Sequence, residues 1–162
     1  MPRIAPKVAI AIIVLTALMS AESVKAAGYI FMPTNTAFTA TGSVTLLGDN
    51  GGRVDCALLV GGAINKKGIG SITSAAVTGA GNCSGIEAMG LPWIMRAGYP
   101  NKIKMSGWTL YVPYLSRNCG PGAVELRDET TVWPIKRSYI AGCVVTGGEL
   151  SPTPTLSIVA GP

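Results

Sequence analysis

Glycine recurs at short intervals along this chain, and its distribution limits the folds that the chain can adopt. All 21 glycines lie at or after residue 28, where they divide the sequence into short apolar runs. Runs this short do not supply the sustained apolar period of about 3.6 residues that marks an amphipathic helix. Short apolar segments separated by glycine-containing turns are typical of all-β proteins. The sequence therefore predicts an all-β fold, a single-domain antiparallel β-sandwich or barrel.

The expected strands lie between these turns. They are Gly42–Leu47, Arg53–Val60, Ile69–Val77, Ser84–Met89, Leu91–Arg96, Lys102–Val112, Thr131–Trp133, Ser138–Thr146 and Thr155–Val159. In the second strand, Val54, Cys56 and Leu58 occupy alternate positions, which places them on one face toward the core. Pro152 and Pro154 indicate a loop before the last strand.

The expected strand Lys102–Val112 has apolar residues of both strand parities. Ile103 and Met105 share one face, whereas Trp108 and the apolar residues after it share the other. A shift of one residue at Ser106-Gly107 would bring both sets to the core, so we predict a β-bulge there.

Two of the tryptophans are expected in the core. Trp108 has the strand parity of its apolar neighbours, and Trp93 lies within an apolar run that begins at Leu91. Trp93 and Trp133 both stand beside a proline, and exposed aromatic residues of a secreted β protein can bind carbohydrate or lipid. Burial is the commoner role of tryptophan in a small β domain, so we predict that Trp93 and Trp108 are core residues.

Residues 1–26 have the features of a secretory signal peptide. Arg3 and Lys7 precede a twelve-residue apolar run, Val8–Met19, and Val24-Lys25-Ala26 offers small residues at the cleavage positions. A membrane span needs about 20 apolar residues, so this run is too short. We therefore expect cleavage after Ala26, with an uncleaved anchor as the alternative. The remainder, residues 27–162, is expected to be one β-rich domain without a transmembrane segment, exported to the periplasm, the cell surface or the medium.

The four cysteines all follow the predicted leader. They are Cys56, Cys83, Cys119 and Cys143. An even number in an exported chain indicates two disulfides, and three pairings can be drawn. We favour the sequence-local pairing, in which each bridge closes a loop of about 25 residues and stabilises the fold by about 3 to 4 kcal/mol. The cysteines are too far apart in sequence for a zinc site.

Charge and composition exclude several functions. Three of the 13 basic residues and one of the eight acidic residues lie in the leader, which leaves ten basic and seven acidic residues and a charge of +3. A charge this small, without basic runs, is not typical of nucleic-acid binding. The chain has no histidine, so the common histidine-based nucleophile systems and metal sites are absent.

A histidine-free hydrolase would need paired carboxylates. Glu125, Asp128 and Glu129 form the one acidic cluster, and Arg127 lies among them. We interpret this cluster as a solvated loop with local ion pairs rather than a catalytic or calcium site. The sequence therefore predicts no enzyme and no catalytic, cofactor-binding or metal-binding residues.

The segment Tyr29–Thr41 is uncharged and contains five large apolar residues. Leaving these side chains in water would forfeit about 1.5 to 3 kcal/mol each, so we expect the segment to pair as a strand. It would pair either within its own sheet, which we favour, or with a neighbouring subunit's sheet by strand addition.

An ordered set of short motifs resembles a known family. The motifs are Asn35–Gly42 (NTAFTATG), Val54–Cys56 (VDC), Asn82-Cys83, Leu91–Trp93 (LPW) and Cys119–Gly122 (CGPG). Over Thr34–Val145 the chain is similar to the protein activator of alkane oxidation, or PraB-like, family. The resemblance implies a small secreted protein of a Gram-negative bacterium that stimulates growth on long-chain alkanes. The family has no assigned catalytic residues to carry over.

Two functional hypotheses follow for the secreted protein. The first is a non-enzymatic accessory protein that binds a hydrocarbon or cell-surface interface and so aids hydrocarbon use. The alternative is a structural subunit of an extracellular fibre or biofilm matrix, which would self-associate by strand addition.

Overall fold

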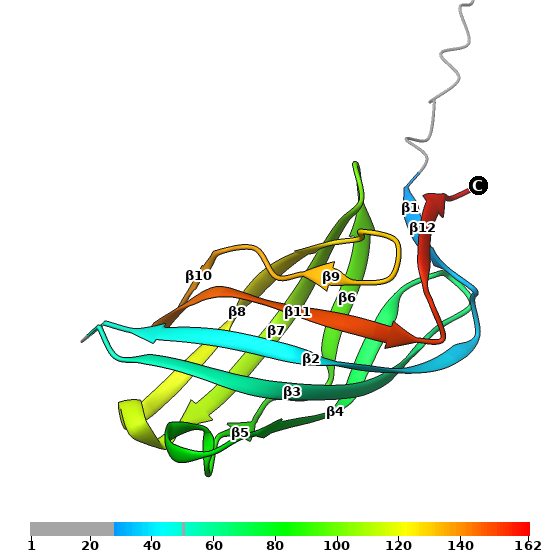
Figure 1. The fold of residues 1–162 in the computed structure, drawn as a ribbon. Helices are drawn as coiled ribbons and strands as arrows, with labels where there is room; N and C mark the ends of the chain where they lie inside the picture. The colour runs from blue at the N-terminus through cyan, green and yellow to red at the C-terminus, as the bar shows by residue number, and fades with distance from the viewer. Residues whose placement is uncertain (1–27, 50) are drawn as a thin grey trace, which may run out of the picture.

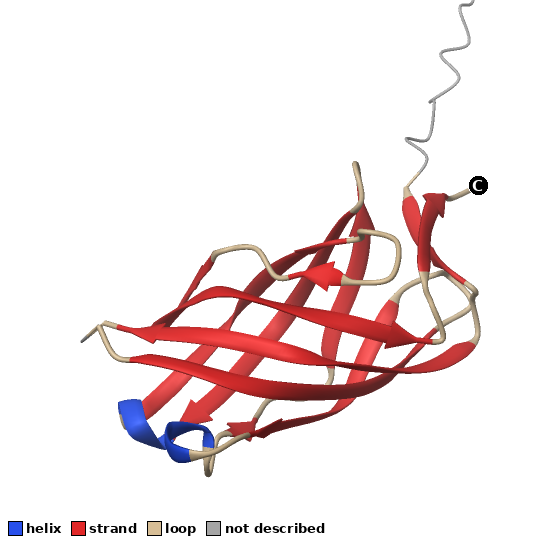
Figure 2. Cartoon of the chain, viewed as in Figure 1, coloured by secondary structure: helices blue, strands red, loops and turns tan. Residues whose placement is uncertain are grey.

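A computed structural model describes residues 28–49 and 51–162, and these residues form twelve strands and two helical turns. The strands are β1 (Tyr29–Met32), β2 (Thr36–Gly48), β3 (Arg53–Ile64), β4 (Gly70–Thr78), β5 (Glu87–Ala88), β6 (Trp93–Gly98), β7 (Lys102–Val112), β8 (Arg117–Arg127), β9 (Trp133–Pro134), β10 (Ser138–Ile140), β11 (Cys143–Thr153) and β12 (Ser157–Ala160). The 3-10 helical turns are η1 (Gly81–Cys83) and η2 (Pro113–Leu115), at the end of the molecule opposite β1 and β12 (Figure 2). No helix among the described residues is long and apolar enough to cross a membrane.

Ten of the strands form one antiparallel sheet that folds over on itself into two layers (Figure 1). Its order is β10-β11-β2-β3-β4-β6-β7-β8, and the short strands β5 and β9 pair with β7 and β11. The two ends of this order meet, because Gly120 N donates to Ala141 O at 2.7 Å and Lys136 N donates to Glu125 O at 2.8 Å. We call this line of contact between β8 and residues 136–141 the seam. The prediction of an antiparallel all-β fold is confirmed.

The interior is filled by apolar side chains from both layers. Val54, Cys56 and Leu58 all point inward, as their alternation predicts. The predicted core tryptophans, Trp93 and Trp108, are both fully buried, and their ring centroids lie 4.7 Å apart. Because the centre of the molecule is packed with large side chains, we look for a binding site at its outer surface and its ends.

The predicted bulge lies within β7. The register between β7 and β8 shifts between Ser106 and Trp108 and again between Trp108 and Leu110. As a result Ile103 and Met105 before Ser106 are buried, and so are Trp108, Leu110 and Val112 after it. The predicted β-bulge therefore explains why the apolar residues on either side of Ser106 have opposite strand parity in the sequence.

Four strand assignments from the sequence were wrong. The expected strand Ser84–Met89 is a turn followed by the two-residue strand β5. The strand β8 was missed, because its Gly120-Pro121-Gly122 reads as a turn. Pro152 is buried within β11 rather than in a loop. The expected strand Ser138–Thr146 is two strands, since Ala141 and Gly142 form a turn between β10 and β11. Gly and Pro residues indicated turns within β8 and at Pro152, but pairing with strands that are distant in sequence determines where the strands begin and end.

Both disulfides have the sequence-local pairing. Cys56 on β3 is bonded to Cys83 in η1, and Cys119 on β8 is bonded to Cys143 on β11. The second bridge crosses the seam, so it joins the two ends of the folded-over sheet.

The segment Tyr29–Thr41 pairs within its own chain. β1 pairs with β12 near the other end of the sequence, and the rest of the segment belongs to β2, which pairs with β3 and β11. This confirms the preferred expectation of intramolecular pairing. The predicted signal peptide, residues 1–26, lies outside the described residues.

Candidate functional site

β1 and β12 form a separate two-stranded ribbon that projects from one end of the folded sheet (Figure 1). Its register places Phe31 opposite Ile158 and Ile30 opposite Val159. Residues directly opposite each other in an antiparallel pair share a face, so the ribbon has two distinct faces. The face with Phe31 is directed inward, since Phe31 is fully buried and its ring centroid lies 6.1 Å from that of Trp133.

The other face of the ribbon is apolar and reaches solvent. It carries Ile30, Met32 and Val159, of which Met32 is 37% exposed and Val159 is 39% exposed. The pairing predicted for Tyr29–Thr41 therefore still leaves Met32 partly exposed. Met32 is on the outer face of a ribbon that is only two strands wide, which leaves part of its side chain in contact with solvent.

A tight turn of residues 65–68 supports the ribbon. The Asn65 side-chain oxygen accepts hydrogen bonds from Lys67 N at 2.9 Å and Ile69 N at 3.1 Å, which closes the turn. Phe31 N donates to Gly68 O at 3.0 Å, so the turn also binds β1 directly. Gly68 has φ +69°, and a Cβ there would lie 2.4 Å from Ile30 Cβ. Only glycine combines this backbone conformation with so close a packing of the ribbon.

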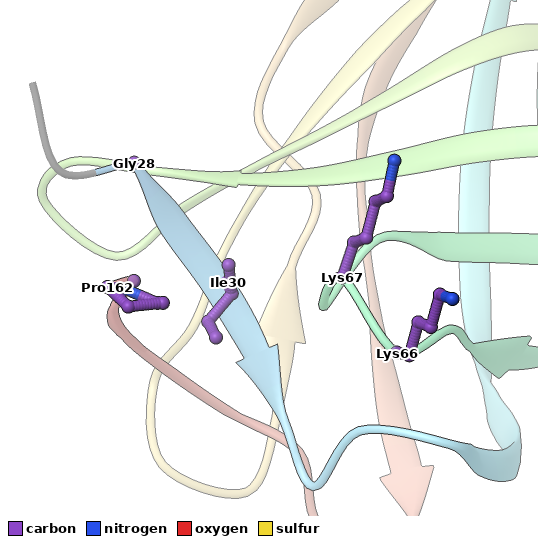
Figure 3. A pocket seen from close by; sticks show the side chains of 6 residues that line it. Gly28, Ile30, Lys66, Lys67 and Pro162 are labelled. Atoms are coloured by element: carbon purple, nitrogen blue, oxygen red, sulfur yellow. The ribbon is translucent and has the colours of Figure 1, made fainter. Parts of the chain in front are cut away.

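The turn and the ribbon enclose a surface pocket of about 600 Å³. Ile30 and Pro162 line it from the ribbon side, and Lys66 and Lys67 line it from the turn (Figure 3). Volumes between about 300 and 1,000 Å³ are usual for small-molecule sites. The pocket therefore has apolar side chains on one side and two lysines on the other, whose ammonium groups point away from Ile30 and Pro162 (Figure 3).

Two loops complete this end of the molecule, which we call the ribbon end. The ring of Tyr99, in the turn between β6 and β7, lies 5.6 Å from that of Tyr29 on β1. The same turn is joined to the loop after β8, where Asp128 N donates to Asn101 O at 2.8 Å. The ribbon end thus consists of the ribbon, the turn 65–68, the tip 98–101 and the loop after β8.

Burial raises the pKa of the Asp128 carboxyl above its ordinary value. Hydrogen bonding with the Trp133 side chain and with the Ile158 backbone acts against this rise. One carboxyl oxygen, Oδ1, has no hydrogen-bond partner among the described residues. Asp128 therefore connects the loop after β8 to β12 at the base of the ribbon.

The opposite end of the molecule also exposes apolar residues. Met89, Tyr111 and Tyr114, around β5 and η2, are 43%, 39% and 48% exposed. The pocket beside the ribbon is lined by none of these three residues. This end has exposure similar to that of the ribbon and provides a natural comparison for it.

The predicted acidic loop is not one unit. Glu125 lies on the outer face of β8, Asp128 is half-buried beside the ribbon, and Glu129 is exposed in the loop. The expected local ion pairs with Arg127 are not among the ion pairs of the described residues, which join Arg53 to Asp55 and Arg117 to Asp49. In the part of the chain that the structure describes, no three side chains of Cys, Asp or Glu lie together as a metal site.

Sequence reasoning located part of the ribbon end and missed the rest. It singled out Tyr29–Thr41 as a strand but could not identify β12 as the partner of β1. Residues 65–68 lie between two of the expected strands, and their sequence Asn-Lys-Lys-Gly indicates a turn that presents two cations. The two lysines of this turn are the sequence signal for one side of the pocket. Their closeness to β1 is visible only in the structure.

Comparisons with known proteins give one result for nearly the whole chain. A family model described as alkane oxidation protein activator, PraA/PraB-like, matches residues 3–160. This match extends past Val145, where the motif resemblance ends, and covers both strands of the ribbon. No curated protein and no solved structure matches the chain.

Proposed function

The chain belongs to the PraA/PraB-like family of alkane oxidation protein activators, and we propose that it is a secreted, non-enzymatic accessory protein that aids hydrocarbon use. In this proposal the ribbon end adsorbs at the boundary between water and hydrocarbon. The observation that carries the proposal is the apolar outer face of the ribbon, formed by Ile30, Met32 and Val159.

The ribbon end has the amphipathic character that adsorption requires. Transfer of apolar surface from water to hydrocarbon is favourable by about 25 cal/mol per Å², so the exposed face of the ribbon gains free energy at the boundary. Lys66 and Lys67 flank that face across the pocket. Lysine places its methylene stem along apolar surface and keeps its ammonium group in water, which would hold the ribbon at the boundary.

Interfacial tension of a liquid long-chain alkane against buffer tests this proposal. We expect the purified protein to lower the tension and the double variant Met32→Ser, Val159→Ser to lose most of this effect. Both side chains are more than a third exposed, so the substitutions should leave the core intact. Denaturation curves of the variant would verify that it folds as the wild type does.

The opposite end supplies a matched control. The double variant Met89→Ser, Tyr114→Ser removes a similar exposed apolar surface and should lower the tension as the wild type does. If this control loses the effect and the ribbon variant retains it, the ribbon end is the wrong site. If the wild type leaves the tension unchanged, adsorption is not the function.

The non-enzymatic part of the proposal has its own test. The alkane should be recovered chemically unchanged after incubation with the purified protein, while added protein should promote growth of cells on that alkane. Appearance of an oxidised or cleaved product would make the protein an enzyme.

The alternative function, a fibre subunit, requires a strand that one copy gives to another. In the structure the candidate strand β1 is paired with β12 of its own chain, and no observation favours exchange. Electron microscopy of the secreted fraction distinguishes the two functions, because a fibre subunit would form filaments.

A further inference from the structure

The outer face of β6, β7 and β8 gathers positive charge. Arg96 on β6, Lys102 and Lys104 on β7, and Arg127 on β8 are all exposed on it. We call these four residues the basic face. The chain carries only ten basic residues after the predicted leader, so four of them occupy one part of a sheet. Glu125 is the acidic residue on the same strands and face.

Strand register places like charges directly opposite each other. Arg96 pairs with Lys104, and Lys102 pairs with Arg127. Such cross-strand pairs destabilise a sheet. The ion pairs of the described residues lie elsewhere and include no member of the basic face. Glu125 lies directly opposite Lys104 and offsets part of this repulsion, but one carboxylate faces four cations.

Protection of a sheet edge does not account for these charges. Lysine often guards unpaired edge strands against aggregation. β7, which carries two of the four cations, is an interior strand paired on both sides with β6 and β8. The arrangement therefore favours a role in binding an anionic partner.

We propose that the basic face binds an anionic lipid surface. Alternate residues of a strand lie about 7 Å apart and neighbouring strands about 5 Å apart, so the cations form a flat array suited to a layer of phosphate head groups. A shallow pocket of about 260 Å³ on this face is lined by Arg96, Lys102, Lys104 and Glu125, with Gly98 in its wall. Its three cations outnumber its one carboxylate, so it suits a single phosphate head group.

The turn between β6 and β7 favours a lipid surface over a soluble polyanion. Tyr99 in this turn is 71% exposed and lies between Arg96 and Lys102 in the sequence. Tyrosine is enriched at membrane–water boundaries because its ring is apolar and its hydroxyl is polar. Single-stranded nucleic acid would instead need aromatic rings on the face itself, and the basic face carries none. This surface goes beyond the proposed function, since its four cations and its ligand differ from those of the ribbon, although Tyr99 also belongs to the ribbon end.

Co-sedimentation with vesicles tests the proposal. The wild type should bind vesicles of phosphatidylcholine and phosphatidylglycerol in equal parts and should not bind pure phosphatidylcholine vesicles. Molar salt should abolish binding, because it screens charges beyond about 3 Å. The double variant Arg96→Gln, Lys104→Gln should bind the anionic vesicles about 30-fold more weakly.

A matched control separates position from net charge. The double variant Arg53→Gln, Arg117→Gln removes the same charge from two exposed ion-paired sites and should bind within about twofold of the wild type. Equal loss in both double variants would overturn the assignment of the basic face. Tighter binding of double-stranded DNA than of anionic vesicles, lost in Arg96→Gln, Lys104→Gln, would overturn the lipid assignment. The ribbon variant Met32→Ser, Val159→Ser should bind vesicles normally, so the two proposals can fail separately.

Discussion

The burial and the pKa of Asp128, at the base of the ribbon, are determined by segments that are distant in the sequence. Its carboxyl is half-buried beside the Trp133 side chain and the Ile158 backbone, and burial raises its pKa. Its sequence neighbours, Arg127 and Glu129, indicate only a charged loop. The tryptophans differ in this respect, because strand parity and an apolar run were enough to predict that Trp93 and Trp108 are buried.

The raised pKa of Asp128 gives stability a defined pH dependence. In the unfolded chain an aspartate ionises near pH 4, whereas the folded protein holds the proton to a higher pH. The folded state therefore binds more protons in this range, and its free energy of unfolding falls as the pH rises through the folded pKa. At a pH below the pKa of Asp128 in the unfolded chain, the carboxyl is protonated in both states, so Asp128 causes no loss of stability there.

Asp128→Asn should remove the part of the fall in free energy of unfolding with rising pH that is due to Asp128. We expect the free energy of unfolding of the variant to rise relative to that of the wild type as the pH is raised from about 3 to 7. Denaturant titrations of both proteins over that range measure the difference, in which the titration of the other carboxyls cancels. If the two pH profiles run parallel, Asp128 has no raised pKa in the folded protein.

At the scale of elements, pairing between distant segments accounts for what the sequence did not reveal. Alternation in Arg53–Val60 and the opposed parities in Lys102–Val112 correctly indicated two strands, an inward face and a bulge. The Lys102-x-Lys104 spacing likewise indicates that both side chains share a face. Register alone places Arg96 and Arg127 beside them. The pairing of β1 with β12 could not be predicted either, since an apolar strand does not specify which other strand it pairs with.

The contact between the turn 65–68 and the ribbon depends on Gly68. Gly68→Ala should lower the free energy of unfolding by about 1 to 2 kcal/mol for its left-handed backbone and by more for the contact with Ile30. Because Phe31 N donates to Gly68 O, displacement of the ribbon should also speed hydrogen exchange at the Phe31 amide. Denaturation and amide exchange measure the two effects.

Gly81→Ala is the matched control for this substitution. Gly81 has a similar φ of +62°, and nothing lies within 4 Å of a Cβ built there. It should therefore show only the backbone cost and leave the Phe31 amide protected. Equal losses of stability in the two variants would mean that Gly68 does not position the ribbon through its contact with Ile30.

At the scale of the whole molecule, closure of the sheet depends on the seam. β8 was absent from the expected strands, so its meeting with residues 136–141 was not predictable from the sequence. Cys119–Cys143 crosses this seam, whereas Cys56–Cys83 joins β3 to η1 away from it. The basic face does not depend on the seam, because β6, β7 and β8 are paired directly with one another.

The two disulfides should therefore differ in what they stabilise. Their sequence separations are 24 and 27 residues, so loss of loop entropy gives about 3 to 4 kcal/mol for either bridge. All four cysteines are buried, which makes replacement by alanine comparable at both sites. Cys119→Ala, Cys143→Ala should lower the free energy of unfolding more than Cys56→Ala, Cys83→Ala, because it also frees the seam to open.

Amide exchange identifies the cause of that difference. Without Cys119–Cys143, the Gly120 and Lys136 amides, which donate across the seam, should exchange faster at denaturant concentrations where the rest of the sheet stays protected. Without Cys56–Cys83, these two amides should keep their protection relative to the sheet. If both double variants lose the same stability and the seam amides exchange only with global unfolding, closure of the sheet does not depend on the bridge. The hydrogen bonds and side-chain packing along β8 would then be sufficient to hold the two ends of the sheet together.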